Sequence, residues 1–192
     1  MMRSRTDTAR YSSVAIAFHW TIALLVIVNL VIGIGHESIP ALRAWMGAHK
    51  AIGITVLALT LARVAWRLTH RPPPLPLGTP VWERVAAHAT HWSLYALMLA
   101  MPLTGWALVS GPQATRPLSW FGLFDLPLLP VAGATADAAG KVHGLLGWLM
   151  LALVVLHVAA ALRHHLILRD HVLARMVPGL HRGARRGDAI AR

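Results

Sequence analysis

The sequence contains no cysteine among its 192 residues. Disulfide bonds, iron–sulfur clusters and prosthetic groups attached through thioether bonds all need cysteine, so the sequence excludes all three. Any metal or prosthetic group must therefore be held by other side chains and by packing. The chain does contain twelve histidines.

Charged residues are also scarce. They make up 13% of the chain, whereas a soluble domain carries about 25%. No charge occurs in residues 11–36, 85–115 or 142–162, and a fourth apolar stretch, between Arg43 and Arg67, is interrupted only by Lys50 and Arg63. Stretches of this length are typical of membrane-spanning helices. The sequence therefore predicts an all-α membrane protein, an antiparallel four-helix transmembrane bundle with helices over about 11–35, 42–68, 81–110 and 138–168.

Acidic residues number seven against eighteen lysines and arginines, and the cations are unevenly placed. If the N-terminus is cytoplasmic, fourteen of the eighteen lie on the inner side of the membrane. The outer side then holds Arg43, Lys50, Arg116 and Lys141. The positive-inside rule predicts that both termini are cytoplasmic. A basic tail beside anionic lipid explains the net charge of +11 without a nucleic acid partner.

The organisation predicted is one domain over residues 1–180, followed by a basic cytoplasmic tail over 181–192. Five prolines in residues 70–80 predict a stiff, extended inner link. The longest connection lies on the outer side, between the third and fourth helices. Its segment 116–130 is apolar and aromatic but too short to span, so we expect it to lie along the outer surface as a short cap.

Two histidines on the last predicted helix organise the functional interpretation. His143 and His157 are fourteen residues apart, which places them about 40° apart around a helix and about 21 Å apart along it. One helix thus offers an imidazole near each side of the membrane. Ionisable residues inside a span are costly and are interpreted first as functional. The simplest use of two neutral imidazoles here is axial ligation of two b-type haems.

Depth in the membrane selects partners for these two ligands. His49 begins the second helix on the outer side, so it pairs with His143 and supplies an outer haem site. The inner ligand His157 has three candidates at its depth, which are His19, His88 and His91.

A packing criterion chooses among the three, because the residue four positions after a ligand meets the porphyrin and should be small. The residues at that position are Ala23, Gly53, Gly147 and Ala161 for His19, His49, His143 and His157, but Trp92 and Tyr95 for His88 and His91. The criterion favours His19 as the inner partner.

The other histidines have plainer interpretations. Loop and tail positions indicate solvated side chains for His36, His70, His171 and His181, and interfacial ones for His164 and His165. A histidine-lined metal or proton pathway is the main rival to haem. Such pathways carry carboxylates inside the membrane, whereas all seven acids here lie in loops or at helix ends. A zinc site would need three or four close ligands rather than separated pairs.

Several segments together resemble the bacterial cytochrome b561 family of four-helix di-haem membrane cytochromes. The matching segments are RYSSVAIAFHW at 10–20, MGAHKAIG at 46–53, AHATHWSLYALMLAMPLTGW at 87–106, WFGLFDLP at 120–127 and HH…RDHVLARMVP at 164–178. The resemblance implies a bacterial inner-membrane location and two non-covalent b haems. The fourteen-residue spacing is shared with haem subunits of hydrogenases and formate dehydrogenases, where the first-helix histidine pairs with the second histidine of the fourth helix.

The resemblance also implies a function. Members of the family pass electrons between a donor and membrane quinone, and some are similar to superoxide:ubiquinone oxidoreductases. We therefore expect transmembrane electron transfer, with superoxide or a redox protein as donor and ubiquinone or menaquinone as acceptor. The alternatives are a haem b carrier subunit docked to a dehydrogenase or hydrogenase, and a haem-free structural protein.

Donor and acceptor sites can be assigned to particular residues. Arg43, Lys50 and Lys141 are expected to ring the exposed edge of the outer haem, where they would pair with propionates or attract an anionic donor. The relatives with the same spacing imply a quinone site near the inner haem. Arg63, His88 and His91 are the polar groups there that could hydrogen-bond a quinone carbonyl.

Overall fold

The computed structural model describes residues 10–70, 73, 79–112, 117–170 and 172–177. Arg116, His171, most of the predicted link over 70–80 and the predicted tail over 181–192 lie outside these residues, so the expectations for them stay predictions.

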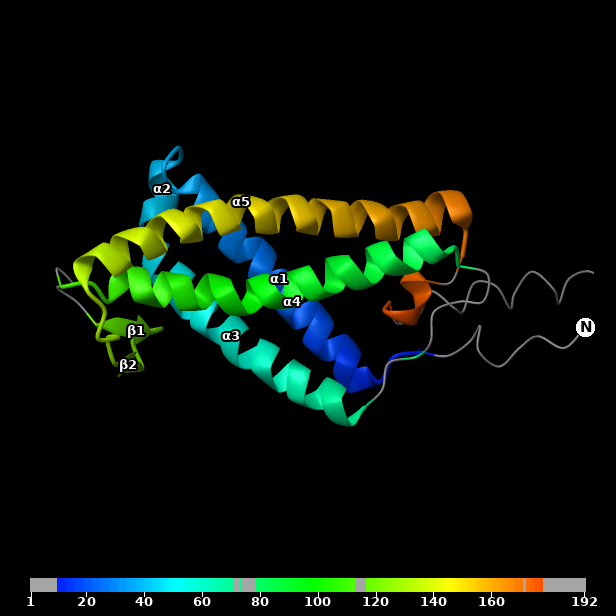
Figure 1. Ribbon diagram of the computed structural model, residues 1–192, viewed down its shortest axis with the longest axis horizontal. Helices are drawn as coiled ribbons and strands as arrows, with labels where there is room; N and C mark the ends of the chain where they lie inside the picture. Colours follow the sequence, from blue (N-terminus) through cyan, green and yellow to red (C-terminus); the bar gives the residue numbers. More distant parts are fainter. Residues whose placement is uncertain (1–9, 71–72, 74–78, 113–116, 171, 178–192) are drawn as a thin grey trace, which may run out of the picture.

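Four long helices dominate the described residues (Figure 1). They are α1 (Ser13–Gly35), α3 (Met46–Thr69), α4 (Val81–Val109) and α5 (Gly133–Arg163), and α5 continues into a π-helical turn, η1 (His164–Leu168). All four are long and apolar enough to cross a membrane. The predicted fold class, an antiparallel four-helix transmembrane bundle, is confirmed.

Two helix starts differ from the predicted ranges. A separate turn, α2 (Pro40–Arg43), precedes α3, so the second span begins at Met46 rather than near residue 42. Proline favours the first position of a helix, which explains a turn that starts at Pro40. The last helix begins at Gly133 instead of residue 138 because its first turns are rich in alanine, the best helix former.

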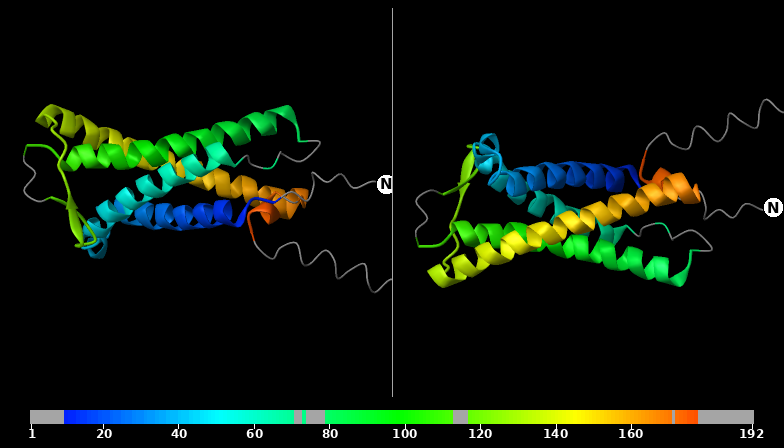
Figure 2. Two further views of the ribbon diagram at one scale, coloured as in Figure 1. Left: turned by 90° about the horizontal axis from the view of Figure 1, so that it is seen from below. Right: turned by 90° about the horizontal axis from the view of Figure 1, so that it is seen from above.

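The helices form two antiparallel pairs, α1 with α3 and α4 with α5, and the pairs meet mainly where α3 packs on α4 (Figure 2). The contact between α1 and α5 is sparse. Buried apolar residues gather between the pairs and include Ile22, Ile52, Val56, Leu97, Met98 and Met150. Toward the end where α1 begins and α5 ends, α1 and α3 spread away from α4 and α5 (Figure 1).

The segment expected to cap the outer surface contains a two-stranded antiparallel hairpin, β1 (Leu118–Trp120) and β2 (Phe124–Leu126). Its turn has positive φ angles at Phe121 and Gly122. The indole Nε1 of Trp120 donates to Thr55 Oγ1 on α3 at 3.0 Å, and Trp106 Nε1 on α4 donates to the carbonyl of Pro127 at 3.0 Å. The hairpin therefore fastens α4 to α3 at the end of the bundle that is predicted to be outer.

Contacts at the opposite end hold the bundle together near the start of α4. Arg163 on α5 forms an ion pair with Glu83 on α4 at 3.1 Å. Trp20 Nε1 on α1 donates to the carbonyl of Met176 at 2.8 Å, just after the short 3-10 helix η2 (Leu173–Arg175). The chain that follows α5 thus returns to α1.

Candidate functional site

Two histidine pairs lie at two depths of the bundle. The ring centroids of His49 and His143 are 6.1 Å apart, and those of His19 and His157 are 6.2 Å apart. An imidazole nitrogen binds a metal at about 2 Å, so two imidazoles on opposite sides of one ion have centroids about 6 Å apart. Both pairs have the separation that one shared metal requires, and α5 spaces them by about 21 Å.

Hydrogen bonds orient the rings of the outer pair. His49 Nδ1 lies 3.2 Å from the Asn29 carbonyl, and His143 Nδ1 lies 3.0 Å from the Met101 carbonyl and 3.2 Å from Thr104 Oγ1. A carbonyl oxygen only accepts, so Nδ1 carries the proton in both rings. Nε2 is then unprotonated, which is the state a metal ligand needs.

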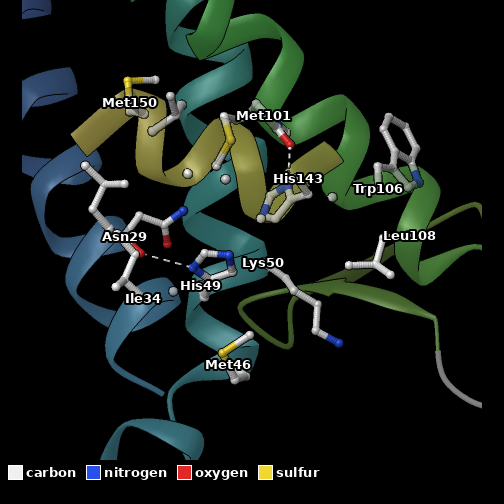
Figure 3. A pocket seen from close by; sticks show the side chains of 18 of the residues that line it. Asn29, Ile34, Met46, His49, Lys50, Met101, Trp106, Leu108, His143 and Met150 are labelled. Carbon is white, nitrogen blue, oxygen red and sulfur yellow. Dashed lines mark hydrogen bonds between the residues drawn. The ribbon is translucent and has the colours of Figure 1, made fainter. Parts of the chain in front are cut away.

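A cavity of about 420 Å³ surrounds the outer pair (Figure 3). This volume lies in the usual range for cofactor sites, about 300–1,000 Å³. Glycines from all four long helices line the cavity, which are Gly33, Gly53, Gly105, Gly140, Gly144 and Gly147. Gly53 and Gly147 are the small residues that follow His49 and His143 by four positions. The donor set, its separation and the glycine-lined cavity fit a planar group such as haem.

The inner pair has a competing neighbour. The His91 ring on α4 lies 5.4 Å from that of His157, so the structure brings both His19 and His91 to this histidine. His88 is exposed and its Nδ1 donates to the Arg84 carbonyl in its own helix at 3.0 Å. The ring of His88 therefore bonds within α4 and does not contact His19 or His157.

Cations and aromatic rings border the inner pair. The guanidinium of Arg63 lies 3.5 Å from His19 Nδ1 and stacks on the buried Tyr95 ring at 5.5 Å. Arg67, one helical turn further, also lies over Tyr95, at 5.8 Å. Arg67 and Tyr95 were not among the predicted site residues, although each follows a candidate, Arg63 or His91, by four positions.

The three cations expected around the outer pair occupy different places. Lys50 lines the cavity, and its ammonium points away from the two imidazoles (Figure 3). The Arg43 guanidinium donates to the carbonyls of His36 and Glu37 at 3.1 and 3.2 Å, so it clamps the turn after α1. Lys141 is exposed and is not among the lining residues. Of the three, the structure brings only Lys50 to the cavity.

Two glycines also belong to the outer site and were missed in the sequence. A Cβ at Gly33 would lie 2.6 Å from Cε1 of His49, and one at Gly105 would lie 3.0 Å from Cε1 of His143. Contacts between helices are not visible in a single sequence. The available signal was weak: each glycine lies within its helix near the depth of the histidine that it meets.

No group of three or more His, Asp or Glu side chains able to hold a metal ion occurs within the described part of the chain. At the outer site the potential ligands are the imidazoles of His49 and His143, whereas at the inner site His19 and His91 both lie near His157.

Comparison with known proteins identifies the family of the chain. Residues 10–179 match the family described as "Prokaryotic cytochrome b561". "Cytochrome b561 homolog 2" of Escherichia coli (strain K12) is 38% identical over 174 residues, 88% of this chain and 91% of that protein. "Probable superoxide oxidase CybB" of Yersinia pestis is 34% identical over 174 residues, 88% of this chain and 96% of that protein. The chain, with its four apolar helices, belongs to the prokaryotic cytochrome b561 family of multi-pass bacterial membrane proteins, which use b-type haem for transmembrane electron transfer.

Proposed function

We propose that this protein carries electrons across the membrane through two b haems, the outer one held by His49 and His143 and the inner one by His19 and His157. The observation that carries the proposal is the pair of nearly equal ring separations, 6.1 and 6.2 Å, at two depths of one bundle. Bound haem supplies a one-electron iron couple. The protein supplies the ligands, their orientation and a low dielectric.

The choice of His19 over His91 follows from distance and size. The 5.4 Å separation of His91 and His157 is short for two imidazoles that each bind one iron at about 2 Å, whereas the 6.2 Å separation of His19 and His157 is suitable. Ala23 also follows His19 by four positions, whereas the bulky Tyr95 follows His91. His91 is then free to act on a second molecule beside the inner haem.

We propose superoxide as the donor, at the outer side, and a membrane quinone as the acceptor, at the inner side. Two superoxide ions each give up one electron and leave as dioxygen, and the quinone takes both electrons and two protons to become quinol. The relative named a probable superoxide oxidase supports this choice. So does Lys50, a cation on the wall of the outer cavity. Both termini then lie in the cytoplasm, as the placement of lysine and arginine predicts.

Reduction by superoxide tests the proposed function. The purified protein should be reduced rapidly by superoxide, at a rate that falls as ionic strength rises, because salt screens the attraction between the anion and the cations near the outer cavity. Exchanging Lys50 and Lys141 together for glutamine should slow the step about tenfold at low salt, the lower end of what steering contributes. Pulse radiolysis with detection of haem absorbance measures the rate.

Lys50→Gln alone should account for most of that loss, since Lys50 lines the cavity and Lys141 does not. Arg84→Gln, which removes one charge at the other end of the bundle, is the matched control and should leave the rate unchanged. Slow reduction, or a rate that ignores both salt and the double variant, would favour a carrier subunit that receives electrons from a dehydrogenase or hydrogenase.

Quinone reduction tests the inner site. Arg63 and His91 are the groups proposed to hydrogen-bond a quinone carbonyl, and we set aside His88 because its ring nitrogen bonds within its own helix. Arg63→Gln or His91→Gln should slow reoxidation of the reduced protein by a soluble ubiquinone analogue about tenfold or more, the cost of losing a charged or buried hydrogen bond. Stopped-flow measurement under nitrogen gives the rate.

The haem spectra of both variants should stay normal, which separates quinone binding from haem binding. His70→Gln is the control, because His70 lies at the same end of the bundle but stacks on Trp66. Unchanged reoxidation in both variants would remove Arg63 and His91 from the acceptor site.

A further inference from the structure

We propose that Gly33 and Gly105 are positioning residues for the outer histidine pair. Each glycine lets an imidazole from the neighbouring helix lie directly against its own backbone, so that Nδ1–H reaches the carbonyl one turn earlier. This inference rests on the proposed function, in which His49 and His143 bind haem iron.

The first of these contacts between a glycine and an imidazole lies between α1 and α3. His49 projects from α3 and donates from Nδ1 to the Asn29 carbonyl of α1 at 3.2 Å. Gly33 follows Asn29 by four residues, so it faces the same side of α1. A Cβ at Gly33 would lie 2.6 Å from Cε1 and 3.1 Å from Nδ1 of His49. A methyl group there would push the ring away from the carbonyl.

The second contact between a glycine and an imidazole lies between α4 and α5. His143 projects from α5 and donates from Nδ1 to the Met101 carbonyl of α4 at 3.0 Å, with Thr104 Oγ1 at 3.2 Å (Figure 3). Gly105 follows Met101 by four residues. A Cβ at Gly105 would lie 3.0 Å from Cε1 and 3.3 Å from Nδ1 of His143. The same arrangement of carbonyl, glycine and imidazole thus occurs twice, in two different helix pairs.

At both glycines, the space that a Cβ would take is filled by the imidazole ring and not by other side chains of the neighbouring helix. The three atoms nearest to a Cβ at Gly33 all belong to His49, and the three nearest at Gly105 all belong to His143. Gly47 and Gly144, on the same helices as the two histidines, would place a Cβ in open space. Glycine is otherwise unfavourable inside a helix, so the first two positions have a specific use.

The bond from Nδ1 has consequences for a metal on Nε2. It fixes the tautomer and the plane of the ring, and it makes the ring a better electron donor to the metal. A stronger donor stabilises the oxidised iron and lowers its reduction potential. No backbone carbonyl accepts a hydrogen bond from the ring of His19 or His157 within the residues described, so the effect is confined to the outer site.

Alanine at each glycine tests the inference in the full-length haem protein. Gly33→Ala and Gly105→Ala should each raise the midpoint potential of the outer haem, change its electron paramagnetic resonance signal and weaken haem retention about 10- to 100-fold, the usual effect of losing such a partner. The inner haem should be unaffected. Gly33→Ala should have the larger effect, because its Cβ would come closer to the ring.

Controls keep the outcome interpretable. Gly47→Ala should match the unmodified protein, because a Cβ there would meet nothing within 4 Å and Gly47 is not among the residues that line the cavity. Thr104→Val removes a second acceptor for His143 Nδ1 and also a hydroxyl that donates to the Met101 carbonyl, so it should change the outer haem alone. An unchanged potential and resonance signal in Gly33→Ala and Gly105→Ala would overturn the inference. So would equal changes at both haems. If His49→Ala and His143→Ala also keep the outer haem, the ligand assignment itself has failed.

Discussion

Replacing His49 or His143 with alanine is expected to remove the outer haem and leave the inner one in place. In the proposed assignment each imidazole is one of two ligands on a shared iron, and the chain has no cysteine to attach a haem covalently. The two sites are about 21 Å apart along α5, so loss of one should leave the other folded. The haem-to-protein ratio should fall by half, with a normal low-spin spectrum from the haem that remains.

His36→Ala is the matched control for these two variants. His36 also lines the outer cavity, but its Nδ1 lies 2.7 Å from the Gly33 carbonyl near the end of α1. It should therefore keep both haems. A full haem complement in His49→Ala and His143→Ala would rule out the outer assignment.

Replacing His157 or His19 with alanine is expected to remove the inner haem, whereas His91→Ala should keep it. The reason is geometric: the 6.2 Å separation of His19 and His157 suits a shared iron, and the 5.4 Å separation of His91 and His157 is short for one. Difference spectra and haem counting on the four purified variants, with His88→Ala included, measure the outcome.

His88→Ala serves as the control and should retain both haems, because His88 is exposed and bonds within its own helix. If His91→Ala or His88→Ala loses a haem while His19→Ala does not, the inner assignment is wrong, and His19 becomes the candidate for the quinone site.

The sequence predicts how deep in the membrane each histidine lies, but not toward which neighbouring helix its side chain points. Depth alone singled out His49 and His143 as the outer pair, because only the second and fourth predicted helices carry a histidine near the outer side, one on each. Three histidines share the inner depth, and the structure brings two of them, His19 and His91, to His157. Which of them faces His157 depends on how each helix is rotated about its axis. This rotation cannot be predicted from a single sequence.

Local contacts explain the remaining differences. The Arg43 side chain is taken up by two carbonyls at the end of α1, and this clamp depends on the short α2 turn, which the hydropathy pattern merges into the next span. The segment 116–130 was expected at the outer surface, but its hairpin was not predicted. Strands of three residues are too short to show a recognisable alternation of apolar and polar residues. Gly33 and Gly105 became visible only once the neighbouring helices were in place.

The continuity of α5 has a consequence for the speed of electron tunnelling. His143 and His157 both project from this one uninterrupted helix, while the opposing histidines come from α3 and α1. The distance between the two proposed iron centres is thus set by helical rise and not by how the helix pairs rock against each other. One residue inserted between these histidines would turn His157 by about 100° and lengthen the gap by about 1.5 Å. The number of helical residues between His143 and His157 therefore fixes the proposed tunnelling distance.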